Sequence, residues 1–337
     1  MNILVTGGAG YIGSHCCLDL LNEGHDIVVI DNLCNSSYES ISRVERLTGK
    51  EISFYKSDLR DKSQVELIFN THRIEAVIHF AGYKAVGESV TNPLKYYNNN
   101  IKSTLMLLEV MTSFDCKRII FSSSATVYSN SNKVPLKESF ELSANHPYGA
   151  SKFFIETILE NLFVSDKSWD IVILRYFNPV GAHKSGAIGE DPQGVPNNLM
   201  PIIAQVASGK KEFLSIFGND YDTHDGTGVR DYIHVIDLVR GHIKALEILS
   251  DLNQVLKINL GTGKGYSVYE IIESFESVSG KKIPYEITYR RSGDVATSYA
   301  DISKAKKILN WESRLNLNDM CKDYWNFQLK NPEGYKK

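Results

Sequence analysis

The chain has 337 residues, of which 42% are hydrophobic and 23% are charged, and its net charge at neutral pH is −3. This composition is typical of a globular protein with a sizeable core, and the length favours two domains or one large α/β unit. The near-neutral charge argues against nucleic acid as a partner, and the lack of a signal-peptide pattern or a membrane-length apolar run predicts a cytoplasmic protein with no membrane partner.

Short apolar runs alternate with amphipathic segments in the first half of the chain. The runs are rich in β-branched residues and apolar on both faces, as buried parallel strands are, and they cover residues 3–5, 27–31, 52–55, 76–80, 118–122 and 171–175. Helical patterns lie between them at residues 15–22, 62–70, 101–111 and 153–163. This alternation predicts an α/β fold with a Rossmann-type, doubly wound parallel sheet.

The pattern changes after residue 178, where loop-like segments rich in Gly, Pro and polar residues appear. Helices are predicted near residues 198–208, 237–249, 268–278 and 304–310, with strands near residues 213–217 and 256–260. We therefore expect a first domain over residues 1–178 and a smaller C-terminal α/β domain over residues 179–337. A return of part of residues 229–250 to the first domain is left open.

The first predicted strand runs directly into a glycine-rich loop that precedes a predicted helix. Gly7, Gly8, Gly10 and Gly13 satisfy both the G-x-G-x-x-G and the G-x-x-G-x-x-G spacing. Such a loop needs glycine where the turn is tight and where the backbone meets a pyrophosphate, an anion that the helix N-terminus also attracts. Asp31 ends the second strand, where a carboxylate accepts hydrogen bonds from a ribose and repels a 2′-phosphate. The pattern predicts bound NAD rather than NADP.

A second group of polar residues follows the fifth predicted strand. Ser124 lies in a serine run at the strand's carboxyl end, where α/β sheets bind ligands. Pro147 then predicts a helix start, and Tyr148 and Lys152 are one turn apart on the same helix face. An ammonium ~4 Å from a phenol, at an effective dielectric of ~20, favours the phenolate by about 4 kcal/mol, or roughly three pKa units. We therefore expect catalysis by Tyr148 as a base near neutral pH, with its pKa lowered by Lys152 and with Ser124 beside it.

These motifs resemble the extended short-chain dehydrogenase/reductase family, and longer blocks resemble its UDP-glucose 4-epimerase branch. The blocks span essentially the whole chain, at residues 80–89, 122–128, 174–183, 196–201 and 226–235. One small departure is Ser129, where the family usually has glycine. The resemblance implies an enzyme that interconverts UDP-glucose and UDP-galactose through a 4-keto intermediate, with NAD retained throughout.

The resemblance also assigns binding roles residue by residue. It implies NAD contacts for Gly7, Gly10, Tyr11, Ile12, Gly13, Asp31, Asn32, Asp58, Leu59, Phe80, Ala81, Lys84, Asn99, Tyr148, Lys152 and Phe177. It implies UDP-sugar contacts for Ser124, Asn178, Asn198, Leu199, Phe217, Arg230, Arg291, Asp294 and Ser298. The planar fork of arginine suits a diphosphate. Because some family members carry tyrosine at the position of Ser298, the serine predicts room for the N-acetyl group of UDP-GlcNAc and UDP-GalNAc.

Three other functions stay open on the sequence alone. Related nucleotide-sugar 4,6-dehydratases carry Thr-Asp-Glu in the serine loop, where this chain has Ser124-Ala125-Thr126. A NAD-dependent nucleotide-sugar dehydrogenase would share the catalytic residues but release NADH, and a non-catalytic NAD sensor would not need Tyr148 and Lys152 together. The five cysteines predict neither a disulfide framework nor a metal site. The resemblance also suggests a homodimer formed through residues 101–111 and 153–163.

Overall fold

The computed structural model describes residues 1–335 except 131–132, 195, 197, 251 and 292, so Asn197 of the 196–201 block lies outside the described residues. The chain divides into two compact units. Unit 1 comprises Met1–Ser129, Phe140–Tyr176 and Val239–Ile258, and unit 2 comprises Asn130–Ser139, Phe177–Leu238 and Asn259–Lys337. That one unit binds NAD and the other the UDP-sugar stays a prediction.

Unit 1 is built on a seven-stranded sheet with the strand order β10-β6-β5-β4-β1-β2-β3. The strands are β1 (Asn2–Thr6), β2 (Asp26–Asp31), β3 (Ser53–Lys56), β4 (Ala76–His79), β5 (Arg118–Ser124), β6 (Asp170–Tyr176) and β10 (Val255–Leu260). From β3 to β6, neighbouring strands pair in parallel. The strand order reverses between the neighbouring strands β1 and β4, as it does in Rossmann-type sheets. The predicted fold class is therefore confirmed. Of residues 229–250, for which a return was left open, those from Val239 onward lie in unit 1.

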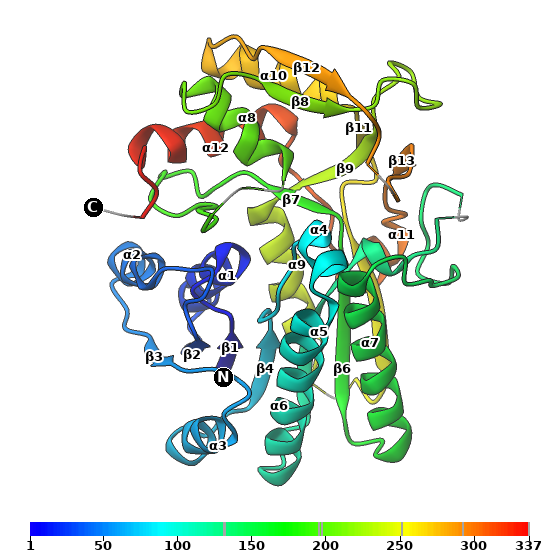
Figure 1. Cartoon of the computed structure of the whole chain (residues 1–337). Coiled ribbons are helices and arrows are strands. Elements are labelled where there is room, and N and C mark those ends of the chain that lie inside the picture. The colour runs from blue at the N-terminus through cyan, green and yellow to red at the C-terminus, as the bar shows by residue number, and fades with distance from the viewer. Residues whose placement is uncertain (131–132, 195, 197, 251, 292, 336–337) are drawn as a thin grey trace. The chain divides into compact units, whose positions relative to one another are not determined.

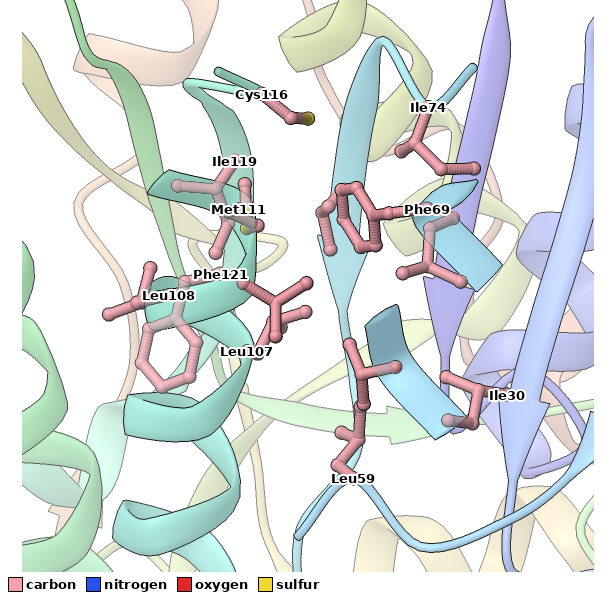
Figure 2. Close-up of a cluster of buried hydrophobic side chains, with 14 of the residues drawn as sticks. Ile30, Leu59, Phe69, Ile74, Leu107, Leu108, Met111, Cys116, Ile119 and Phe121 are labelled. Atoms are coloured by element: carbon pink, nitrogen blue, oxygen red, sulfur yellow. The ribbon is translucent and has the colours of Figure 1, made fainter. Parts of the chain in front are cut away.

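Helices flank this sheet (Figure 1). They are α1 (Tyr11–Asn22), α2 (Tyr38–Thr48), α3 (Lys62–Thr71), α4 (Val86–Thr91), α5 (Pro93–Tyr96), the π-helix η1 (Tyr97–Ile101), α6 (Lys102–Ser113), the 3-10 helix η2 (Ala125–Val127), α7 (Pro147–Ser165) and α9 (Val235–Glu247). Helices α3, α6 and α7 pack on one sheet face, in a core where Figure 2 shows Phe69, Leu107 and Met111 together with Ile30 and Phe121 from the strands. Adjacent strand residues point to the opposite face and are buried there as well.

Unit 2 is smaller and is organised around one central strand. Its elements are β7 (Asn178–Val180), α8 (Leu199–Ala207), β8 (Leu214–Phe217), β9 (Val229–His234), β11 (Gly265–Tyr266), α10 (Val268–Ser279), β12 (Tyr285–Thr288), β13 (Thr297–Ser298), α11 (Ser303–Leu309) and α12 (Leu317–Lys330). Strand β9 pairs with β7, β11 and β13, and β8 pairs with β12. Helices α8, α10 and α12 supply core residues such as Ile203, Phe275 and Tyr324. Within the described part of both units, every helix is too short or too polar to cross a bilayer.

Candidate active site

The turn between β1 and α1 is built from glycines that have different structural needs. Gly7 has φ +69°, and a Cβ there would lie 2.9 Å from the backbone nitrogen of Ala81. A Cβ on Gly13 would lie only 2.3 Å from the carbonyl oxygen of Gly7. Gly10 is the N-cap residue of α1. It has an ordinary φ of −74° and makes no side-chain hydrogen bond to the helix N-terminus. Helix α1 begins at Tyr11, four residues before the predicted start, and its N-terminal N–H groups are suited to an anion.

Asp31 lies beside this loop, as the sequence predicted. Its Oδ2 accepts a hydrogen bond from the Ala9 nitrogen at 3.0 Å, and its Oδ1 accepts from the Leu33 nitrogen and the Ser36 hydroxyl. Burial raises the pKa of this carboxyl, and the hydrogen bonds from Leu33, Ser36 and Ala9 oppose that shift. A carboxylate has about four acceptor positions, so these three bonds leave one for a ribose hydroxyl.

Sequence reasoning missed an arginine near the same corner. The Asn32 side chain donates to Asp58, and Arg60 makes hydrogen bonds to both oxygens of Asp58 at 2.8 Å. These bonds hold the pKa of the Asp58 carboxyl far below its usual range. The Arg60 guanidinium is thus engaged by a carboxylate, which keeps the corner suited to NAD rather than to a 2′-phosphate.

The remaining predicted NAD residues are spread over several elements. Ala81 donates its backbone N–H to the Thr6 hydroxyl at 3.3 Å, and the Asn99 amide donates to Asn100 within η1. Tyr11 and Ile12 open α1, and Phe80 follows β4 with its ring 5.0 Å from that of His242. Three other predicted contacts differ in setting, since Leu59 lies in the buried core, Lys84 is exposed and Phe177 belongs to unit 2.

The predicted Ser–Tyr–Lys group comes together in unit 1. Ser124 ends β5, and its Oγ accepts hydrogen bonds from the backbone N–H and the hydroxyl of Thr126 at 3.2 and 3.0 Å. With these acceptor positions filled, its own proton is free to donate, and Ser124 is hydrogen-bonded to the Tyr148 phenol. The close approach of α7 to this loop depends on Gly149, where a Cβ would lie 2.8 Å from the carbonyl oxygen of Thr126.

Lys152 is buried on the same helix and points at β5. Its Nζ donates to the carbonyl oxygen of Ser122 at 2.7 Å and lies 4.9 Å from the centre of the Phe121 ring. Burial lowers the pKa of this ammonium to about 8, and the carboxylate of Glu156 opposes that shift.

The pKa predicted for Tyr148 needs a correction. Burial raises the pKa of the phenol, and the bond to Ser124 only partly offsets that rise. The sequence argument counted the attraction of the ammonium but not the desolvation of the phenolate, and in this structure desolvation dominates. Tyr148 and Ser124 are therefore hydrogen-bonded to each other, while the lowered pKa is not what the protein alone provides.

Most of the predicted UDP-sugar residues are linked to one another through contacts in unit 2. Arg291 lies over the Phe217 ring at 4.8 Å and donates from Nε to Asp294 at 3.0 Å. Arg230 on β9 lies 3.7 Å from the same Asp294 and is in register with Ser298 on β13. Two guanidinium groups share one carboxylate, which leaves a positive charge suited to a phosphate group.

The other predicted substrate residues of unit 2 come from β7 and from the start of α8. Asn178 is exposed at the start of β7, which pairs with β9, and the Asn198 amide donates to Glu190 at 3.3 Å just before Leu199 opens α8. Sequence reasoning missed Tyr221, whose buried hydroxyl has no hydrogen-bond partner among the described residues. Its charged neighbours include Arg230 and Arg291. A buried orphan hydroxyl marks a position where a ligand can accept or donate.

Comparison with known proteins places the whole chain in one group. The family model described as GDP-mannose 4,6 dehydratase matches residues 4–324. The UDP-glucose 4-epimerase of Bacillus subtilis is 57% identical over 100% of this chain and 99% of its own length. That of Bos taurus is 53% identical, over 99% of this chain and 98% of its own length.

Solved structures agree with the sequence relatives. The UDP-glucose 4-epimerase of Bifidobacterium longum, in complex with NAD+ and UDP, is 51% identical, with a TM-score of 0.96, and covers 99% of this chain and 100% of that chain. The UDP-Glc/GlcNAc 4-epimerase of Campylobacter jejuni is 36% identical, with a TM-score of 0.85, over 98% of this chain and 99% of that chain. The chain described here belongs to the UDP-glucose 4-epimerase family.

Proposed function

We propose that this protein interconverts UDP-glucose and UDP-galactose by reversible oxidation at C4 of the hexose, with NAD bound throughout the cycle. The observation that carries the proposal is the hydrogen-bonded Tyr148 and Ser124 pair, on the same unit as a dinucleotide-type glycine loop. The named relatives, at more than half identity over full length, support the same reaction.

The residues of unit 1 fit NAD. Gly7 and Gly13 allow a turn that any Cβ would obstruct, and Gly10 leaves its surroundings open at the helix N-terminus. Asp31 retains an acceptor position for the adenosine ribose. Bound NAD supplies a hydride acceptor and donor for C4 and a positive charge near the phenol. That charge would favour the phenolate, which burial alone disfavours.

Each catalytic residue then has a distinct task. Tyr148, as phenolate, accepts the proton of the sugar O4 and later returns it. The single Ser124 proton, which faces the Tyr148 phenol without substrate, would turn to the sugar O4 once the sugar binds, because Thr126 occupies the acceptor positions of Ser124. Lys152 holds a positive charge beside β5 that favours ionised Tyr148. The 4-keto sugar must present its other face before reduction, so the hexose is held loosely while binding strength resides in the UDP group.

We assign UDP binding to unit 2. The Arg230 and Arg291 guanidinium groups suit the diphosphate, Asp294 the uridine ribose and Phe217 the uracil ring. Asn178, Asn198 and Leu199 complete the proposed contacts. The orphan hydroxyl of Tyr221 supplies a further hydrogen bond near the phosphates.

The test uses purified protein with no added cofactor. On this proposal, NAD co-purifies with the protein, UDP-galactose is converted to an equilibrium mixture with UDP-glucose, and no net NADH accumulates. Stoichiometric NADH release would indicate the dehydrogenase instead, and loss of water from the sugar the dehydratase. Binding of NAD without any turnover would leave only the sensor.

A second substrate class is favoured by the small side chain at Ser298. This residue lies on β13 in register with Arg230, the residue that we assign to the diphosphate. We propose that UDP-GlcNAc and UDP-GalNAc are also interconverted. Ser298→Tyr should abolish turnover of the N-acetyl sugars and leave UDP-galactose turnover in place; equal loss on both substrates would refute the idea.

We also propose that the protein is a homodimer. Exposed apolar side chains occur on α5, α6 and α7, at Leu94, Leu105 and Phe154, and these helices contact the common segment η1 or one another. Apolar exposure of this kind is typical of association surfaces. The cytoplasmic location expected from the sequence stays a prediction.

A further inference from the structure

A buried ion pair lies one helical turn beyond Lys152, and the proposed mechanism does not use it. Glu156 on α7 is 1% exposed and Arg175 on β6 is 0% exposed. Arg175 donates from Nε and Nη2 to the two carboxylate oxygens, at 3.0 and 2.6 Å. Ser123 of β5 donates its hydroxyl to the same carboxylate. Arg175 also donates to the Tyr128 hydroxyl at 3.1 Å.

Stability alone is a weak reason for such a pair. Removing two charges from water is costly, and well-packed apolar side chains of similar volume are often as stable or more so. The position of the pair suggests another role. Ser123 lies between two residues of the proposed catalytic group's surroundings. The Ser122 carbonyl oxygen accepts a hydrogen bond from the Lys152 ammonium, and Ser124 is hydrogen-bonded to Tyr148. The Glu156 carboxylate therefore ties α7 to the strand segment that aligns both groups.

The Glu156 carboxylate of this ion pair also affects the charge state of Lys152. Tyr148 and Glu156 are on the same helix as Lys152, and His79 on β4 is an electrostatic neighbour of Lys152 on the sheet. Burial lowers the pKa of His79 to about 3, so that ring is neutral.

Elements packed against α7 add few other charges. On α4, Glu88 is paired with Lys95 and bonded to the Tyr96 phenol of α5, and Tyr176 on β6 is a neutral phenol. Arg175 is held in its ion pair with Glu156. Glu156 is thus the carboxylate among the described groups whose field favours the charged form of Lys152.

We propose that Glu156, fixed by Arg175 and Ser123, is a positioning residue that keeps Lys152 charged and seated on the Ser122 carbonyl. This inference deepens the proposed function, because it rests on the role assigned there to Lys152. Glu156 itself is assigned no contact with substrate or cofactor in the proposed function. It acts through the lysine and through the end of β5.

The test is Glu156→Gln in the full-length protein. Nitrogen NMR of the lysine side chains, with the Lys152 signal assigned by its loss in Lys152→Met, follows the titration of Lys152 directly. We expect its pKa to fall by roughly one unit or more, the usual effect of losing a neighbouring opposite charge. The alkaline limb of the kcat profile should move down in pH by the same amount.

Two further variants keep the outcome interpretable. Glu160→Gln is the matched control, one turn farther along α7, where the carboxylate is 43% exposed and pairs with Lys257; it should leave both titrations unchanged. If Glu156→Gln does not fold because Arg175 is left unpaired, the double variant Glu156→Gln/Arg175→Met removes both charges and should still lower the Lys152 pKa.

A folded Glu156→Gln or double variant whose Lys152 titrates as in the wild type would overturn the proposal and leave the pair a purely structural one. Because the NMR titration does not depend on turnover, this result is distinct from a failure of the proposed epimerase activity.

Discussion

Alanine substitutions in the glycine loop separate the glycines that the fold needs from the one that a ligand needs. Gly13→Ala would place a Cβ 2.3 Å from the Gly7 carbonyl oxygen and 2.8 Å from the Gly8 Cα, both of them backbone atoms that cannot rotate away. Gly10→Ala would meet only the Gly7 oxygen, at 3.2 Å, from an ordinary φ of −74°. The first change should therefore damage the fold, and the second should not.

The magnitudes follow from the same geometry. Gly13→Ala overpacks a rigid turn and should lower the free energy of unfolding by about 1–3 kcal/mol or more. Gly10→Ala gains ~0.4–1 kcal/mol by restricting the unfolded chain, which roughly offsets its one tight contact. For Gly7, φ +69° adds ~1–2 kcal/mol of backbone strain to the approach to Ala81. Gly49→Ala is its matched control, with φ +68° and nothing within 4 Å of the Cβ.

Two measurements on each variant test this reasoning. Denaturant unfolding of NAD-free protein should rank Gly13→Ala and Gly7→Ala as the least stable, with Gly49→Ala between them and the wild type. NAD titration should show Gly10→Ala binding at least about tenfold more weakly, a loss of ~1.4 kcal/mol, at unchanged stability. Unaltered NAD affinity in Gly10→Ala, or a loss of stability equal to that of Gly13→Ala, would refute the assignment of Gly10 to the pyrophosphate.

Three other predictions concern the phenol, a buried histidine and the helix surface. Tyr148→Phe should lower kcat for UDP-galactose by about 10²–10⁴-fold while bound NAD is retained, as measured by turnover and by NAD content after denaturation. Because the pKa of His79 is about 3 in the fold and about 6.5 in the unfolded chain, acidification from pH 6.5 towards 3 should cost about 1.4 kcal/mol of unfolding free energy per pH unit, and His79→Gln should reduce this slope in denaturant titrations. Leu105→Asp combined with Phe154→Asp should give monomers in analytical ultracentrifugation; an unchanged mass would exclude this surface from the dimer.

The repeated buried strands of unit 1 made its sheet predictable. Apolar runs with no polar alternation occur where both sheet faces are covered, and each predicted run lies within a residue or two of an observed strand. Helices with a polar surface were harder to predict from the sequence. The prediction omitted α2, although Ser37 caps its N-terminus and Gly49 ends it at φ 68°. It also omitted α12, whose capping box of Asn316 and Asp319 precedes residues that become buried.

The proposed catalytic group could be selected from the sequence because its residues are close in the chain or end a strand. Tyr148 and Lys152 share a helix face by spacing alone, and Ser124 follows from the edge at which α/β sheets bind ligands. Arg60 and Tyr221 were missed because each depends on a tertiary neighbour. A partner carboxylate engages Arg60, and a buried hydroxyl without a hydrogen-bond partner distinguishes Tyr221 from the other tyrosines that the structure describes.

The disagreement over Tyr148 shows what spacing cannot supply. Burial raises the pKa of the phenol and lowers that of Lys152, so desolvation pushes both groups towards their neutral forms. A phenolate and an ammonium are each disfavoured alone, and each is favoured when other charges oppose the desolvation. Glu156 does so for the lysine, and a cation bound near the phenol would do so for the tyrosine. The reactive ionisation state is therefore a property of the charges assembled around the pair, which includes a ligand as well as the chain itself.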